Sequence, residues 1–202
     1  MGEIRSFKRF ETKDIKASYL VEEVQRSWQE CTIKVISYKG MGIIFYTDEE
    51  IKIGNISDSK KVVHIGCGPV PSTSILIAKK TGASVTGIDK NPTAIKLARS
   101  IIHDLGYSKN IEIKHAEASD FNVGDFDVIL ISHGIKPIDK FLKHISKTMK
   151  QDTIAVFRTF SSDYEELINT DYNLKDLFKI GKIATYEKHG SVISVGLFKK
   201  QD

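Results

Sequence analysis

The amino-acid sequence predicts an α/β fold with a mostly parallel, seven-stranded sheet that ends in an antiparallel hairpin. Three observations predict it. From Ser59 onward, short apolar runs alternate with amphipathic stretches, which is the pattern of parallel strands connected by helices. The first apolar run leads into a glycine-rich turn at 66–68. Near the C-terminus, two β-rich runs follow one another across a turn that contains glycine, which favours a hairpin at the sheet edge.

The strands and helices of this fold follow from the apolar pattern along the chain. Strands are expected at 61–65, 84–88, 111–114, 127–132 and 153–158, helices at 72–81, 92–105 and 137–149, and the closing hairpin in KIATYEK (182–188) and SVISVGLFKK (191–200). The helix at 92–105 has the best-defined pattern, because its apolar residues share one face, Pro92 lies in its first turn and Gly106 follows its end. Residues 161–178 form a less regular stretch, rich in Tyr, Glu, Leu and Asn.

The N-terminal part of the chain differs in kind from the rest. Apolar residues recur at helical spacing between Ile15 and Trp28, which predicts a helix. The runs CTIKVISY (31–38) and GIIFYT (42–47) predict a second hairpin. We therefore expect a small cap of one helix and one hairpin at 1–59, packed on an α/β domain at 60–202.

The composition argues against several classes of function. Thirty Lys and Arg residues are interspersed with 26 Asp and Glu residues, so the net charge of +4 indicates no nucleic-acid surface. No apolar run reaches the roughly 18 residues of a membrane-spanning helix, and the charged N-terminus has no apolar leader segment. Cys31 and Cys67 lie far apart without metal spacing, which is typical of a reducing compartment. We expect a cytoplasmic protein that binds neither nucleic acid nor membrane.

The turn after the first predicted strand of the α/β domain is the most informative segment. Gly66, Cys67 and Gly68 connect a buried strand directly to a helix, so the backbone can approach a ligand where a Cβ atom would intrude. A tight turn without a ligand is the alternative. Asp89 ends the next strand at the same sheet edge, where its carboxylate can accept hydrogen bonds from two ribose hydroxyls or cap the helix near Pro92.

A nucleoside cofactor at this edge could be a dinucleotide or S-adenosylmethionine. The dinucleotide fingerprint G-x-G-x-x-G/A has a small residue where this chain has Pro71. Pro69 and Pro71 also remove two N–H groups that a pyrophosphate would bind. The turn therefore favours S-adenosylmethionine over NAD.

The segment from about 60 to 200 resembles the class I S-adenosylmethionine-dependent methyltransferases, which have a Rossmann-like fold. The resemblance rests on IGCG (65–68), GIDKNP (87–92), HAEASDF (115–121) and FDVILIS (126–132), in the order and spacing of that family. It implies that the glycine turn runs along the methionine and ribose of the cofactor, that Asp89 holds the ribose, and that the segment after the third strand meets the adenine. The implied cofactor-binding residues are Gly66, Cys67, Gly68, Pro69, Asp89, Lys90, Glu117, Ala118 and Ser132.

A narrower resemblance concerns the group that is transferred. GCGPVPSTSILIAKK (66–80) is similar to the GxGPLP motif and following helix of nicotianamine synthase-like proteins, and FRTF (157–160) resembles their RTY/F segment. Those enzymes transfer a 3-amino-3-carboxypropyl group instead of methyl. They also carry a larger helical domain before the cofactor domain than the 60 or so residues found here, so methyl transfer is the first expectation.

Three residues are candidates for the catalytic side of the site. His133, just past the fourth strand, could take a proton from an amine acceptor, or be a hydrogen-bonded turn histidine. Arg158, near the end of the fifth strand, could bind a carboxylate bidentately, or form a structural ion pair. Tyr19 lies on the predicted N-terminal helix, where a core position is the alternative. No constellation of metal ligands is recognised, and no metal is expected.

These observations predict an S-adenosylmethionine-dependent methyltransferase that acts on a small molecule, with an amine or amino acid as a possible acceptor. The absence of an Asn/Asp-Pro-Pro-Tyr/Phe sequence after the fourth strand argues against nucleic-acid bases as acceptors. The first alternative is aminocarboxypropyl transfer. The second is a noncatalytic module that binds the cofactor and recruits a partner. The oligomeric state does not follow from the sequence.

Overall fold

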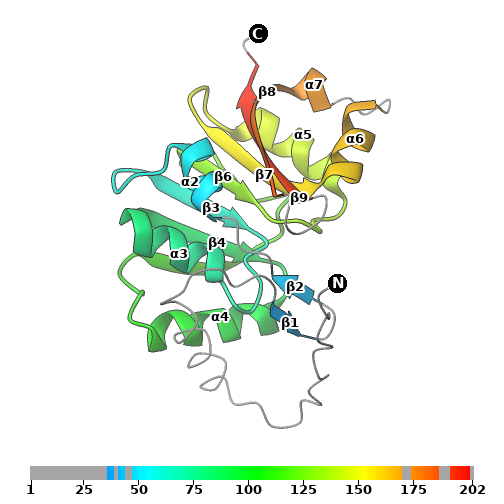
Figure 1. The fold of residues 1–202 in the computed structure, drawn as a ribbon. Coiled ribbons are helices and arrows are strands. Elements are labelled where there is room, and N and C mark those ends of the chain that lie inside the picture. The colour runs from blue at the N-terminus through cyan, green and yellow to red at the C-terminus, as the bar shows by residue number, and fades with distance from the viewer. Residues whose placement is uncertain (1–35, 39–40, 44–46, 170–173, 187–191, 201–202) are drawn as a thin grey trace, which may run out of the picture. The chain divides into compact units, whose positions relative to one another are not determined.

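The computed structural model describes residues 36–38, 41–43, 47–169, 174–186 and 192–200 (Figure 1). All of them belong to one compact unit, Ile33–Asp202. The helix predicted between Ile15 and Trp28 lies outside the described residues, and so does Tyr19. The predicted N-terminal hairpin is confirmed, because β1 (Ile36–Tyr38) pairs antiparallel with β2 (Met41–Ile43).

A seven-stranded sheet forms the centre of the molecule, with strand order β5-β4-β3-β6-β7-β9-β8. Its first five strands are parallel, and β9 pairs antiparallel with both β7 and β8. The strands are β3 (Lys61–Ile65), β4 (Ser84–Asp89), β5 (Ile111–His115), β6 (Val128–Ile131), β7 (Ile154–Phe160), β8 (Phe178–Thr185) and β9 (Val192–Lys199). The predicted fold class is confirmed.

Helices cover both faces of this sheet (Figure 1). They are α2 (Thr47–Gly54), α3 (Ser72–Thr81), α4 (Pro92–Asp104), α5 (Ile138–Thr148), α6 (Ser161–Asn169) and α7 (Leu174–Leu177). On one face, α5, α6 and α7 pack with alternate strand residues into an apolar cluster, called here the main apolar cluster, which includes Val63, Ile129 and Phe141. Because both faces are covered, the central strands are apolar at nearly every position.

Local signals explain the helix boundaries that the sequence predicted. Asn91 caps α4, since its side-chain oxygen accepts from the backbone N–H groups of Thr93 and Ala94. Pro92 occupies the first turn, where a backbone N–H group would have no acceptor within the helix, so the proline costs no hydrogen bond. Helix α3 ends at Gly82, whose φ of 76° is a left-handed conformation that glycine adopts without strain. These short-range signals place the expected helices within one residue of their observed ends.

The largest differences from expectation concern two helices and the start of one strand. Helix α2 follows the N-terminal hairpin and takes Thr47 from the strand predicted at 42–47, because β2 ends at Ile43 and three acidic residues fill the first helical turn. Helix α6 occupies the first half of the less regular stretch 161–178, where no helix was predicted. No residue of α6 is fully buried, so its apolar signal is weak. Strand β8 begins at Phe178, four residues before the predicted start.

Helix α2 lies within the predicted cap at 1–59 but packs on the central sheet. It contacts β7 and β9 and neighbours α3. The approach is close, because a Cβ atom built on Gly196 of β9 would lie 3.0 Å from the Ile53 side chain. This part of the chain therefore contributes to the described compact unit, while the boundary between the two predicted domains stays a prediction. Among the helices of the described ranges, none has the length and apolar character needed to cross a membrane.

Candidate functional site

The candidate site lies where the connections of the sheet change direction. Strand β3 pairs with β4 on one side and with β6 on the other, so the segments that follow these strands leave the sheet edge in opposite directions. Open α/β sheets bind ligands in the crevice at such a switch point, outside the carboxyl ends of the strands. The structure brings the glycine turn, Asp89 and Ser132 to this edge.

The glycine turn has the backbone conformation that the sequence predicted. Gly66 and Gly68 have φ values of 75° and 67°, which residues with a side chain rarely adopt. The N–H groups of Gly66 and Cys67 donate to the Ile88 carbonyl at 2.9 and 3.0 Å, which ties the turn to β4. A Cβ atom built on Gly68 would meet nothing within 4 Å. The turn is therefore fixed on its protein side and leaves open space on the other.

Asp89 connects the end of β4 to this turn. Its Oδ2 accepts from Gly68 N at 3.0 Å, and its Oδ1 accepts from Asn91 N at 2.9 Å. Asn91, and not Asp89, is the N-cap of α4. A carboxylate offers about four acceptor positions, so two bonds to backbone N–H groups leave room for two more from a ligand.

Cys67 is a packing residue of the turn. Its side chain is 5% exposed. Burial and the neighbouring Asp89 carboxylate raise the pKa of the Cys67 thiol to about 12. The thiol therefore stays protonated at neutral pH and is no nucleophile.

The residues predicted to meet the adenine also lie near Asp89. The N–H group of Ala116 donates to the Asp89 carbonyl at 3.1 Å, and the His115 ring nitrogen Nε2 bonds the Lys90 carbonyl at 2.9 Å. The segment after β5 is thereby attached to the segment after β4. The side chain of Glu117 is exposed, whereas Ala118 is half-buried against the main apolar cluster. Their roles toward a cofactor stay predictions.

His64 is a site residue that sequence reasoning missed. It is the fourth of the five residues of β3 and is 4% exposed. Its Nδ1 is hydrogen-bonded to Ser74 and its Nε2 to Ser132, both at 2.8 Å. Burial, assisted by the positive charge of Arg158, lowers the pKa of His64 to about 3. The ring is therefore neutral at physiological pH. The one available signal was a lone histidine inside the apolar run VVHI.

Arg158 forms a buried ion pair with Glu50, a second residue that the sequence did not single out. Its Nε donates to Oε1 at 2.7 Å and its Nη2 donates to Oε2 at 2.5 Å. Ser194 Oγ donates to the same Oε1 at 3.0 Å. The structural ion pair that the sequence allowed is thus present, and Glu50 takes two of the five N–H groups of the guanidinium.

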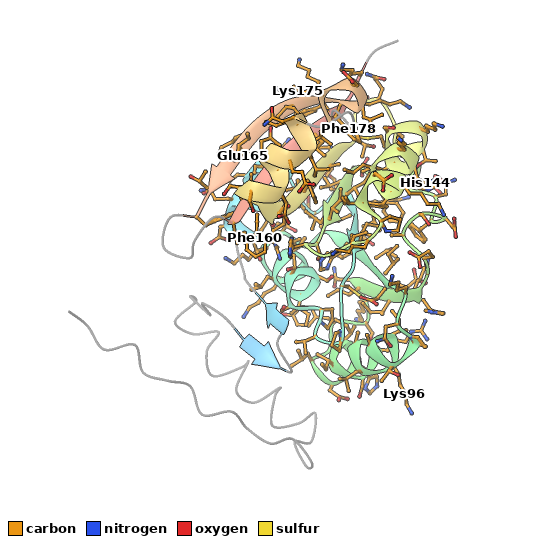
Figure 2. All side chains as sticks on the ribbon, turned by 90° about the vertical axis from the view of Figure 1, so that its right-hand side faces the viewer. Lys96, His144, Phe160, Glu165, Lys175 and Phe178 are labelled. Atoms are coloured by element: carbon orange, nitrogen blue, oxygen red, sulfur yellow. The ribbon has the colours of Figure 1, made fainter. Side chains whose placement is uncertain are left out.

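His133 is exposed beside two groups that the sequence did not connect with it. Its ring packs edge-on against Phe160 with 4.4 Å between centroids, and its Nδ1 lies 3.9 Å from Asp163 Oδ2. Figure 2 shows Phe160 at the end of β7, where α6 begins. His133 and Asp163 are 44% and 48% exposed, so the pair is accessible at the β6 and β7 side of the sheet edge.

Comparison with known proteins agrees with this geometry. The family described as "Methyltransferase domain" matches residues 56–192, which is more than half of the chain. A solved point mutant of MtNAS, a nicotianamine synthase, in complex with S-adenosylmethionine superposes with a TM-score of 0.67 at 22% identity, over 76% of this chain and 60% of that chain. A second structure of the same mutant gives a TM-score of 0.71 at 20% identity, over 92% of this chain and 69% of that one. These identities show a shared fold.

Two curated proteins are similar in sequence. The L-histidine 2-aminobutanoyltransferase of Yersinia pestis is 34% identical over 64 residues, which are 32% of this chain and 24% of that protein. The ubiquinone/menaquinone biosynthesis C-methyltransferase UbiE of Geobacter sp. (strain M21) is 30% identical over 169 residues, with coverage of 78% of this chain and 63% of that protein. The chain thus spans about a quarter of the length of the first relative and less than two thirds of the length of the second.

Proposed function

Because the chain belongs to the methyltransferase domain family, we propose that it is an S-adenosylmethionine-dependent transferase that acts on a small molecule, and that the transferred group is methyl. One observation carries the proposal. The Gly66–Gly68 turn is hydrogen-bonded to Asp89 at the switch point of the sheet, with open space over Gly68. This is the arrangement that an adenosyl ribose requires, namely close backbone approach beside a carboxylate with free acceptor positions.

The described residues fit such a cofactor. Gly66 and Gly68 would lie along the methionine and ribose, with Cys67 and Pro69 shaping the turn. Asp89 would accept from the ribose hydroxyls, beside Lys90. Glu117 and Ala118 would face the adenine, and Ser132 would meet the amino-acid end. Pro69 and Pro71 lack N–H groups, so this turn offers little to a pyrophosphate and we expect no NAD binding.

The chemistry needs few catalytic groups from the protein. When bound, the cofactor supplies an electrophilic carbon next to a sulfonium sulfur. The protein has to hold the acceptor in line with that carbon, and most of the rate gain comes from this positioning. An amine acceptor has to be neutral, and we propose that exposed His133 takes its proton. Arg158 is assigned the structural role that its pairing with Glu50 supports, and Tyr19 stays a prediction.

A second candidate function is transfer of the 3-amino-3-carboxypropyl group. It is supported by the likeness to a nicotianamine synthase over 76–92% of this chain and by the 34% identity with an aminobutanoyltransferase. An amine or amino acid is the acceptor class that both candidates share. The expected location of the enzyme is the cytoplasm, which agrees with the buried free thiol of Cys67.

The spent cofactor distinguishes the candidates. The protein is incubated with S-adenosylmethionine and a small-molecule extract, and the nucleoside products are identified by mass spectrometry. S-adenosylhomocysteine indicates methyl transfer, and methylthioadenosine indicates aminocarboxypropyl transfer. The Asp89→Ala variant is the control for a contaminating enzyme. Tight binding in calorimetry without turnover would favour the noncatalytic module, and binding of NAD in place of S-adenosylmethionine would overturn the proposal.

A further inference from the structure

A chain of three polar side chains crosses the core between helix α3 and the candidate site. Ser74 on α3 bonds Nδ1 of His64, and Nε2 of His64 bonds Ser132 at the end of β6, each at 2.8 Å. Ser74 is fully buried, His64 is 4% exposed, and Ser132 is half-buried. The chain therefore begins in the core and ends at the sheet edge.

The direction of these hydrogen bonds follows from Ser74, which is the buried end of the three linked side chains. A neutral imidazole carries one N–H donor and one acceptor nitrogen, whereas a serine hydroxyl can serve as either. Within the part of the chain that the structure describes, the Ser74 hydroxyl has His64 as its hydrogen-bond partner. If Ser74 accepted from Nδ1–H, its own proton would be buried without an acceptor, at a cost of about 1–3 kcal/mol. Ser74 therefore donates to Nδ1.

The donor role of Ser74 determines which groups donate at His64 and at Ser132. With Nδ1 accepting, the ring proton of His64 is on Nε2, and it donates to Ser132 Oγ. The Ser132 hydroxyl keeps its own proton for a third group. Ser132 lies against the glycine turn, because a Cβ atom built on Gly66 would be 3.4 Å from Ser132 Cβ. The available proton is therefore at the crevice where the ligand is expected.

We propose that Ser74 and His64 are positioning residues that hold Ser132 as a hydrogen-bond donor toward a carboxylate oxygen of the bound ligand. The inference rests on the proposed function, since the amino-acid end of S-adenosylmethionine is the part that carries a carboxylate. It makes Ser132 a specificity-determining contact, because a ligand with a donor group at that position would face a second donor. His64 acts through Ser132 and does not touch the ligand.

The tautomer of His64 is the first test, and it needs no ligand. Two-bond ¹H–¹⁵N correlation spectra of the full chain with ¹⁵N-labelled histidine distinguish a proton on Nε2 from one on Nδ1. The His64→Gln variant assigns the signal. We expect the Nε2–H tautomer at pH 7. The Nδ1–H tautomer would overturn the proposal, because Ser132 would then have to donate its proton to Nε2 of His64.

A double-mutant cycle is the second test, with S-adenosylhomocysteine as the probe in calorimetry. Ser132→Ala is expected to weaken binding about tenfold, the size of one hydrogen bond to a charged group. His64→Leu is expected to weaken it by a similar factor in the parent chain and by less than twofold in the Ser132→Ala background. His64→Gln, whose amide can donate to Ser132, is expected to stay within threefold of the parent.

The outcomes separate this inference from the proposed function. If the parent chain binds S-adenosylhomocysteine but the two substitutions act additively, His64 has only a structural role. The proposal that His64 acts on the ligand through Ser132 is then wrong. If the parent chain binds no S-adenosyl compound, the proposed function fails and Ser132 loses its assignment as a ligand donor, whatever the tautomer. If His64→Leu does not fold, the proposal is still tested by the tautomer measurement. The affinities of the Ser132→Ala and His64→Gln variants for S-adenosylhomocysteine test it as well.

Discussion

Asp89 has two tasks at the candidate site. It organises the protein, because each of its oxygens accepts from a backbone N–H group, at 3.0 Å from Gly68 N and at 2.9 Å from Asn91 N. The remaining lone pairs are the proposed ribose contacts. Asp89→Ala is expected to lower the affinity for S-adenosylhomocysteine by about 1.5 to 3 kcal/mol. Calorimetry measures this loss, and an unchanged affinity would remove Asp89 from the site.

Gly68 allows a direct test of close ligand approach. Gly68→Ala adds a methyl group that meets no protein atom within 4 Å, at a φ of 67° that costs about 1 to 2 kcal/mol for a residue with a side chain. Gly106→Ala is the matched control, because Gly106 has a φ of 74°, equally open space, and a position after the far end of α4. We expect similar losses of unfolding free energy for both variants, measured by urea denaturation.

Cofactor affinity should separate these two glycines. Only Gly68→Ala is expected to weaken binding of S-adenosylhomocysteine, because its new methyl group enters the space assigned to the ligand. Equal affinities of the two variants would show that no ligand approaches the backbone at Gly68, and the turn would then serve packing alone.

The sequence predicted the local features of the candidate site and single residues such as Ser132 and Arg158, but not the distant residues with which these two pair. The glycines of the turn and the capped helix after Asp89 are local patterns, and they were found. The pairs that sequence reasoning missed are distant: His64 and Ser132 are 68 residues apart, and Glu50 and Arg158 are 108 apart. Nothing local marks such a pair, because the two members become neighbours only through the order of strands in the sheet.

At the level of elements, α2 is attached to the sheet by the buried ion pair of Glu50 and Arg158. The side chains are 3% and 11% exposed, so neither charge has much water around it. Glu50→Gln removes the carboxylate charge from this buried pair, which is expected to lower the free energy of unfolding by about 3 to 5 kcal/mol. Urea denaturation measures the change, and amide exchange should show α2 losing protection first.

Glu49 on the same helix is the control for this prediction. It pairs with Lys52 and Lys182 at the surface, where solvent and salt screen the charges. Glu49→Gln is therefore expected to leave the urea midpoint close to that of the parent chain. If both glutamine variants had the same midpoint, the buried pair would contribute no more than a surface pair, and α2 would be held by its apolar contacts.

The elements that were missed have weak local signals. Helix α3 has the predicted boundaries, and α4 differs from its prediction by one residue, because proline, asparagine and glycine mark their ends. Helix α6 buries no residue fully, although Tyr164, Leu167 and Ile168 pack against the main apolar cluster at helical spacing. Helix α2 is stabilised by tertiary contacts. Such contacts are not visible in the periodicity of eight residues.

At the scale of the whole molecule, the α2 and α3 face of the sheet contains a layer of buried polar groups. Thr73 and Ser74 come from α3, His64 from β3, Arg158 from β7 and Ser194 from β9. Folding thus takes a histidine ring out of water and keeps it neutral, next to a guanidinium that disfavours a second positive charge. This couples the stability of the whole fold to pH.

The sign of the coupling follows from the two pKa values of His64. Burial lowers the pKa from 6.5 to about 3 in the folded state, so between these values the unfolded chain binds a proton that the folded chain does not. The contribution of this group to the free energy of unfolding is fully present above about pH 6.5. It is lost as the pH falls, at up to about 1.4 kcal/mol per pH unit.

Urea denaturation of the parent chain and of His64→Gln from pH 7 to pH 4.5 isolates the effect, since all other groups are shared. We expect the difference in unfolding free energy to shift in favour of the variant as the pH falls. A difference that stays constant would mean that His64 accepts its proton in the folded state without cost, and that the core around it is open to water.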